Sequence, residues 1–182
     1  MDNKFPTRFL VTGACRSGKS RYALDRFART GGQKYYLATA EAGDQEMSAR
    51  ILQHQKERGA SWITLEEPVD LLPLVESRIS EASVLLLDCL TLWISNLMHR
   101  RLKEEDIYQR AGDLAGLLAS APCSVAVVTN EVGWGVVPDN PLGRAFRDLA
   151  GRINQRFANC FDEVILMVSG LPVHVKRPAN PE

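Results

Sequence analysis

The sequence contains few cysteines and carries no excess of charge of either sign. Its 182 residues include four cysteines, at positions 15, 89, 123 and 160, and none of them forms a Cys-x-x-Cys motif. Such wide spacing argues against a structural zinc site and fits reduced thiols. The formal net charge is zero, so no overall electrostatic field attracts nucleic acid or an anionic membrane.

Long apolar runs and flexible linkers are also missing. No uncharged apolar stretch approaches the roughly 18 residues of a membrane span. The first residues, MDNKFPTRFLVTG, lack the apolar core and cleavage site of a signal peptide. No repeat, low-complexity segment or Gly/Ser/Pro-rich linker divides the chain. We therefore expect a single domain over residues 1–182, located in the cytoplasm, with no nucleic-acid partner and no membrane span.

Short apolar segments alternate with segments of helical periodicity. The apolar segments show no polar alternation, which is typical of strands buried on both faces of a parallel sheet. They lie at 9–12, 34–38, 83–88, 124–129 and 163–168, with 62–68 as a further candidate. The helical segments lie at 20–28, 44–58, 90–102, 107–120 and 141–158. This alternation predicts a three-layer α/β fold with a mostly parallel sheet, followed by a frayed tail from His174.

Residues 13–20, GACRSGKS, match the phosphate-loop pattern G-x-x-x-x-G-K-[ST] between a predicted strand and a predicted helix. In such a loop, backbone N–H groups surround the phosphates, and the lysine, here Lys19, reaches the β- and γ-phosphates. Ser20 would bind Mg²⁺ through its hydroxyl. We therefore predict that the chain binds a nucleoside triphosphate through Gly13, Ala14, Cys15, Arg16, Ser17, Gly18, Lys19 and Ser20.

Asp88 ends a buried apolar segment, where a second Mg²⁺ ligand is expected. Cys89 follows it, whereas a carboxylate there would indicate a motor-type ATPase with a base that activates water. No Asn/Thr-Lys-x-Asp motif for reading guanine in a switch GTPase occurs. A small-molecule kinase and a nucleotidyl transferase both remain open. The loop after residue 129 also ends a strand, so Glu131 is expected near the site, although a solvent-facing loop is the alternative.

Five segments together resemble a known family, the bifunctional adenosylcobinamide kinase/adenosylcobinamide-phosphate guanylyltransferase of cobalamin biosynthesis. The resemblance runs from Phe9 to Pro172 and is carried by residues 13–20, 38–68, 85–97, 128–155 and 168–172. It implies a P-loop fold similar to RecA, assembly as a homotrimer, and Mg²⁺ as cofactor. It also implies GTP or ATP and adenosylcobinamide or its phosphate as substrates.

The resemblance implies two reactions and assigns residues to them. ATP or GTP phosphorylates the aminopropanol hydroxyl of adenosylcobinamide, and GMP is then transferred from GTP through a GMP-histidine intermediate to give adenosylcobinamide-GDP. His54 matches the nucleophilic histidine of the family. The positions that match nucleotide contacts are Ala38, Thr39, Ala40, Gln55, Lys56, Glu57, Arg58, Glu66 and Asp88.

Without the resemblance, His54 would be interpreted as a packed histidine on an amphipathic helix, because its spacing identifies no base or orienting partner. Two alternatives follow. One is a P-loop small-molecule kinase without covalent chemistry, and the other is a nucleotide-dependent switch or interaction module. Glu131 and Asp88 are the candidates for the base of the kinase reaction, and the residues that hold the corrinoid are not identified.

Overall fold

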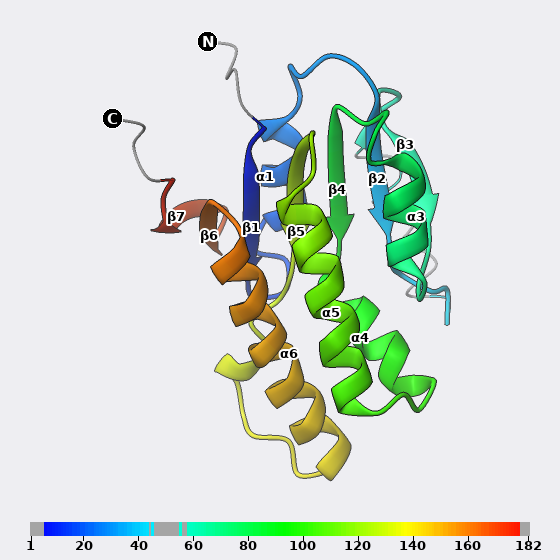
Figure 1. The fold of residues 1–182 in the computed structure, drawn as a ribbon. Helices are drawn as coiled ribbons and strands as arrows, with labels where there is room; N and C mark the ends of the chain where they lie inside the picture. The colour runs from blue at the N-terminus through cyan, green and yellow to red at the C-terminus, as the bar shows by residue number, and fades with distance from the viewer. Residues whose placement is uncertain (1–5, 44, 46–54, 56–57, 179–182) are drawn as a thin grey trace.

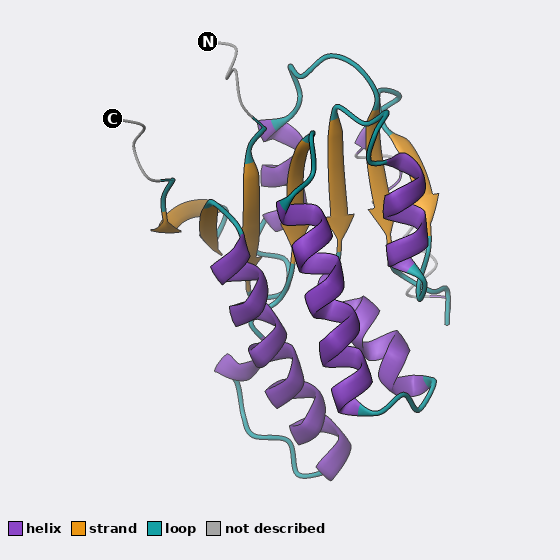
Figure 2. Cartoon of the chain, in the orientation of Figure 1, coloured by secondary structure: helices purple, strands orange, loops and turns teal. Residues whose placement is uncertain are grey.

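The structure is a computed structural model that describes residues 6–43, 45, 55 and 58–178. In this part of the chain, seven strands form one sheet in the order β3-β2-β4-β5-β1-β6-β7 (Figures 1 and 2). Neighbouring strands run parallel, except for β7, which is antiparallel to β6. The strands are β1 (Arg8–Gly13), β2 (Lys34–Ala38), β3 (Ile63–Glu66), β4 (Val84–Asp88), β5 (Ser124–Val128), β6 (Glu163–Val168) and β7 (Leu171–Lys176).

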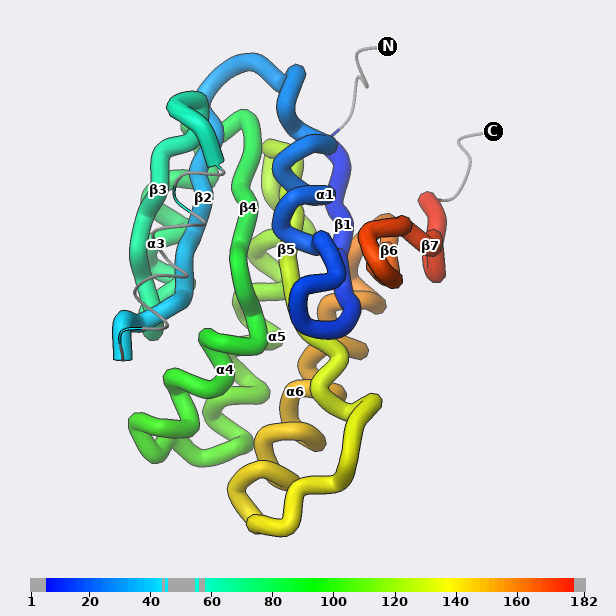
Figure 3. Tube along the Cα trace, turned by 180° about the vertical axis from the view of Figure 1, so that it is seen from behind, coloured from blue at the N-terminus to red at the C-terminus, as the bar shows by residue number. Residues whose placement is uncertain are grey.

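Helices cover both faces of the sheet, which confirms the predicted three-layer α/β fold. Helix α1 lies on one face, and α3, α5 and α6 lie on the other, as the two opposite views in Figures 1 and 3 show. Among the described residues, no helix is both long and apolar enough to cross a membrane. The helices are α1 (Lys19–Arg26), α3 (Leu71–Arg78), α4 (Leu90–His99), α5 (Glu104–Ala119) and α6 (Pro141–Cys160), with a short 3₁₀ turn, η1 (Val132–Trp134).

The apolar side chains of the central strands divide between two cores, one on each face of the sheet. On β4, Leu85 and Leu87 pack with α3, α4, α5 and α6, whereas Val84 and Leu86 pack with α1. Because successive strand residues point to opposite faces, a strand covered on both sides needs apolar residues at every position. This burial explains why the strand segments show no polar alternation.

Helix α3 and strand β7 were not predicted from the sequence. Helix α3 contains Pro73, but this proline lies in the first helical turn, where a missing N–H breaks no hydrogen bond within the helix. The expected frayed tail is wrong as far as Lys176, because residues 171–176 form β7. A two-residue turn, Ser169 and Gly170, with φ of 50° and 84°, reverses the chain between β6 and β7.

Candidate nucleotide-binding site

The phosphate loop connects β1 to α1, as its sequence predicts. Helix α1 begins at Lys19, after Gly18 with φ of 93°. Gly13 has φ of 145°, and a Cβ added there would lie 2.5 Å from the carbonyl oxygen of Met167 on β6. Side chains rarely tolerate either the conformation or the contact. Both glycines are therefore required by the path of the loop.

Lys19 is buried inside this loop, with 7% of its surface exposed. Its Nζ donates to the carbonyl oxygens of Ala14 at 2.6 Å and Gly13 at 3.1 Å. Burial lowers the pKa of Lys19, and the negative charge of the nearby Asp88 carboxylate opposes that shift. A polyphosphate in the loop would offer this ammonium anionic acceptors in place of neutral carbonyls, and such charge-assisted hydrogen bonds are stronger.

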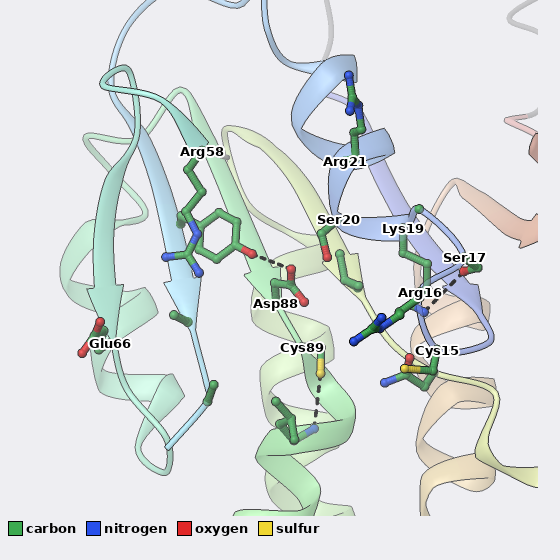
Figure 4. Close-up of a pocket in the computed structure, with 17 residues that line it drawn as sticks. Cys15, Arg16, Ser17, Lys19, Ser20, Arg21, Arg58, Glu66, Asp88 and Cys89 are labelled. Atoms are coloured by element: carbon green, nitrogen blue, oxygen red, sulfur yellow. Dashed lines mark hydrogen bonds between the residues drawn. The ribbon is translucent and has the colours of Figure 1, made fainter. Parts of the chain in front are cut away.

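A cavity of about 470 Å³ opens beside the loop, a size typical of small-molecule sites. Its walls come from the loop, α1, the carboxyl ends of β2, β3, β4 and β5, and the start of α4, which is where ligands bind in open α/β sheets. The predicted nucleotide-binding residues that line it are Cys15, Arg16, Ser17, Gly18, Lys19, Ser20, Ala38, Ala40, Arg58, Glu66 and Asp88. Chain segments far apart in sequence therefore meet at one site (Figure 4).

Other predicted residues lie beside the cavity or outside the described part of the chain. The carbonyl groups of Gly13 and Ala14 accept from Lys19, as described above. Thr39 is fully buried, and its hydroxyl donates to the carbonyl oxygen of Cys89 at 2.8 Å and accepts from its N–H at 2.9 Å. The Thr39 side chain therefore joins β2 to β4 and does not face the cavity. The predictions for His54, Lys56 and Glu57 concern residues outside the described ranges.

Gln55 and Arg58, which flank two of those residues, both contact β3. Nε2 of Gln55 donates to Oε1 of Glu66 at 3.1 Å, and Nη1 of Arg58 donates to the hydroxyl of Thr64 at 3.3 Å. Arg58 and Glu66 line the cavity. The wall opposite the phosphate loop thus combines a cation with a carboxylate, groups suited to phosphate and to hydroxyl or N–H donors respectively.

Ser20 and Asp88 fit the predicted Mg²⁺ site. Figure 4 shows the Ser20 hydroxyl and the Asp88 carboxylate turned toward one another across the cavity. In the described ranges, no group of three or more His, Cys, Asp or Glu side chains could hold a metal ion. Mg²⁺ bound with a nucleotide usually takes one or two protein ligands and completes its shell with phosphate oxygens and water. This donor set therefore suits a nucleotide-bound Mg²⁺.

Glu131 lies at the edge of this site. Its Oε1 accepts from the Thr12 hydroxyl at 2.6 Å, and its backbone N–H donates to the carbonyl oxygen of Gly13 at 3.2 Å. It does not line the cavity, whereas the preceding residue, Asn130, does. Glu131 therefore connects the loop after β5 to β1, and of the two candidate bases only Asp88 reaches the cavity.

Sequence reasoning missed Tyr36, which lines the cavity from β2. Its hydroxyl donates a short hydrogen bond to Oδ2 of Asp88, and the guanidinium of Arg58 lies 3.7 Å from the centre of its ring. The alternation of side chains along a strand could have identified Tyr36 from the sequence. Ala38 was predicted at the site, and the residue two positions earlier shares its face of the sheet.

Comparisons with known proteins agree on fold and family. The RadB recombinase structure matches with a TM-score of 0.54 over 97% of this chain and 83% of that one, at 14% identity, which supports the RecA-like fold alone. Bifunctional adenosylcobalamin biosynthesis protein CobU of Salmonella typhimurium is 42% identical over 92% of this chain and 98% of its own length. CobP of Pseudomonas aeruginosa is 41% identical over 93% and 97%, and CobU of Escherichia coli is 38% identical over 92% and 98%. The family described as cobinamide kinase / cobinamide phosphate guanyltransferase matches residues 9–175, and the chain belongs to this family.

Proposed function

We propose that this protein phosphorylates adenosylcobinamide and then transfers GMP from GTP to adenosylcobinamide phosphate, giving adenosylcobinamide-GDP. The observation that carries the proposal is that one cavity brings together the phosphate loop, Asp88, Arg58 and Glu66 in a member of this family. A phosphate loop alone serves many reactions. Arg58 and Glu66 add contacts on the side of the cavity opposite the phosphate loop.

In the kinase reaction, the aminopropanol oxygen attacks the γ-phosphorus of ATP or GTP. The bond from that phosphorus to the β–γ bridging oxygen breaks, the nucleoside diphosphate leaves, and the alcohol proton is released to solvent. Transfer of this kind is catalysed mainly by positioning and by neutralising charge, which the loop N–H groups and Lys19 supply. Bound Mg²⁺, held by Ser20 and Asp88, would neutralise charge on the phosphate oxygens.

In the guanylyl transfer, an imidazole nitrogen of His54 attacks the α-phosphorus of GTP and pyrophosphate leaves. A phosphate oxygen of adenosylcobinamide phosphate then attacks the same phosphorus, and the bond to His54 breaks. An imidazole nitrogen is a nucleophile that forms covalent intermediates in group transfer. This role of His54 is supported by the residues near it in sequence: Gln55 contacts Glu66 and Arg58 contacts Thr64, both on β3 beside the cavity. Lys56 and Glu57 stay predicted nucleotide contacts.

The test uses GTP labelled at the α-phosphate and, in parallel, at the γ-phosphate. Each is incubated with the protein and Mg²⁺, and the denatured protein is tested for retained label in acid and in alkali. We expect an acid-labile, alkali-stable adduct from the α-label alone, absent in His54→Ala. If nucleotide binds and wild type forms no adduct, a kinase without covalent transfer becomes the better account.

We also infer a homotrimer, which the family resemblance implies. Light scattering of the purified protein should then give a mass three times the 20.2 kDa of one chain. A mass equal to one chain at micromolar concentration would contradict this inference and leave the proposed reactions untouched.

A further inference from the structure

We propose that Tyr36 is a positioning residue that orients two groups of opposite charge at the nucleotide cavity. Its hydroxyl holds the carboxylate of Asp88, and its ring face holds the guanidinium of Arg58. The inference deepens the proposed function and rests on it, since it concerns how the same cavity receives the triphosphate and its metal ion.

Tyr36 is itself held rigidly. It lies in β2 between β3 and β4, in register with Thr64 and Leu86, and only 1% of its surface is exposed. The edge of its ring meets Trp62 in a T-shaped arrangement, with centroids 6.2 Å apart and planes at 90°. Strand pairing on both sides and aromatic packing together leave the ring little freedom to move.

The hydroxyl fixes one oxygen of Asp88. The Tyr36 hydroxyl donates to Oδ2 of Asp88, a residue that the pairing of β2 with β4 brings to the same end of the sheet. With Oδ2 engaged by Tyr36, the other carboxylate oxygen of Asp88 is turned away from the Tyr36 hydroxyl (Figure 4) and stays available at the cavity that Asp88 lines. The terminal torsion of a free carboxylate is broad. The hydrogen bond therefore selects one orientation of this predicted metal ligand.

The ring face fixes Arg58. The guanidinium carbon lies 3.7 Å from the ring centre, and stacking of a planar cation on an aromatic face sets the plane of the cation. Nε of Arg58 has no hydrogen-bond partner among the described residues, and Nη1 donates to Thr64. The stack, more than hydrogen bonding, therefore keeps Arg58 against the cavity, and its charge is available for a phosphate.

The two roles can be separated by substitution. Tyr36→Phe removes the hydroxyl and keeps the ring, so it should affect Asp88 alone. Tyr36→Leu removes both contacts. Tyr35→Phe is a matched control, because Tyr35 is the next residue of the same strand and its hydroxyl also donates to a carboxylate, Oε1 of Glu81 at 2.6 Å. Tyr35 belongs to the core on the other face of the sheet and does not line the cavity.

The experiment measures metal and nucleotide binding separately, with a GTP analogue whose α and β phosphates are joined by methylene, so that no GMP is transferred. Mn²⁺ binding to the protein–analogue complex is followed by electron paramagnetic resonance. Analogue binding in EDTA is followed by calorimetry. Removal of a group that hydrogen-bonds to a metal ligand typically weakens metal binding by about 10- to 100-fold. We therefore expect about tenfold weaker Mn²⁺ binding in Tyr36→Phe, with its affinity for the analogue in EDTA unchanged. In Tyr36→Leu we expect both Mn²⁺ binding and analogue binding to be lost.

Tyr35→Phe should bind Mn²⁺ and analogue like wild type, and melting curves establish that each variant is folded at the assay temperature. Wild-type Mn²⁺ affinity in folded Tyr36→Phe would overturn the role toward Asp88. Wild-type analogue affinity in EDTA for folded Tyr36→Leu would overturn the role toward Arg58. If wild type binds analogue and Mn²⁺ yet makes no product from authentic substrates, the proposed function fails while the binding comparison still stands.

Discussion

The side-chain amide of Asn96 on α4 donates to the carbonyl oxygen of Thr39, at a distance of 2.8 Å. The same nitrogen donates to the carbonyl oxygen of Pro68 at 3.1 Å. Thr39 follows β2 and Pro68 follows β3, so one buried amide connects the ends of two cavity-lining strands to the helix that follows Asp88. These strand ends would otherwise present unpaired carbonyl groups to the interior.

Replacing this amide should lower both stability and nucleotide affinity. Asn96→Ala leaves two carbonyl groups without their partner, a change that costs about 1–3 kcal/mol. Urea unfolding of the nucleotide-free protein should show this loss, and calorimetry should show weaker GTP binding. Gln109→Ala is the control, because this exposed side chain donates to Asp113, four residues along the same helix, and lies outside the cavity lining. Equal urea midpoints for wild type and Asn96→Ala would contradict the structural role.

Nucleotide should protect one exposed cysteine from alkylation and leave another unaffected. Cys15 and Cys160 are exposed, whereas Cys89 and Cys123 are buried, and Cys15 lines the cavity. We expect iodoacetamide to label Cys15 and Cys160 in the folded protein, as peptide mass spectrometry would show. Saturating GTP with Mg²⁺ should slow labelling of Cys15 at least about tenfold if access requires an empty site, with no change at Cys160. Equal slowing at both cysteines would point to a global effect and not to this cavity.

The buried thiol of Cys89 should make the protein less stable in alkali. Burial raises its pKa to about 12, whereas a thiol in the unfolded chain has a pKa of about 8.5. The folded chain keeps a proton that the unfolded chain releases, so the free energy of unfolding falls as the pH rises above that value.

The measurement compares urea unfolding at pH 8 and pH 10 for wild type and Cys89→Ala. Between pH 8 and pH 10, the free energy of unfolding of the wild type should fall by about 2 kcal/mol more than that of the variant. Cys160→Ala, at an exposed thiol, should behave like wild type. If the free energy of unfolding depends on pH in the same way in wild type and Cys89→Ala, the Cys89 thiol ionises equally in the folded and the unfolded chain, and the prediction is wrong.

The sequence was sufficient to predict the elements that depend on local pattern. Residues 13–20 form the predicted loop. Helix α6 begins at Pro141, where the predicted helical segment 141–158 begins, and Asn140 caps it by accepting a 2.7 Å hydrogen bond from the N–H of Gly143. In each case a few adjacent residues carry the physical cause, either an unusual backbone conformation or an unsatisfied helix terminus. Patterns of this kind need no knowledge of distant contacts.

The sequence did not predict side-chain partners and strands that depend on pairing between distant segments. The strand period could have placed Tyr36 on the same face as Ala38, but its contact with Asp88, 52 positions away, exists only because β2 pairs with β4. The hydroxyl of Thr39 bonds to the backbone of Cys89, 50 positions away, a partner that no local pattern indicates, and the nucleotide contact that the family resemblance implies for Thr39 stays a prediction. Strand β7 was missed because its residues are exposed and its formation depends on the turn at Ser169 and Gly170.

Substitution of Lys19 tests whether one phosphate loop serves both transfers. Lys19→Ala and His54→Ala would each be assayed for γ-phosphate transfer to adenosylcobinamide and for the α-labelled protein adduct. Loss of a single electrostatic contact to the transferred group typically lowers the rate about 100-fold or more. We predict that Lys19→Ala loses both activities by at least this factor, whereas His54→Ala loses the adduct and keeps γ-transfer. An adduct formed at the wild-type rate by Lys19→Ala, in a protein that has lost γ-transfer, would contradict the account.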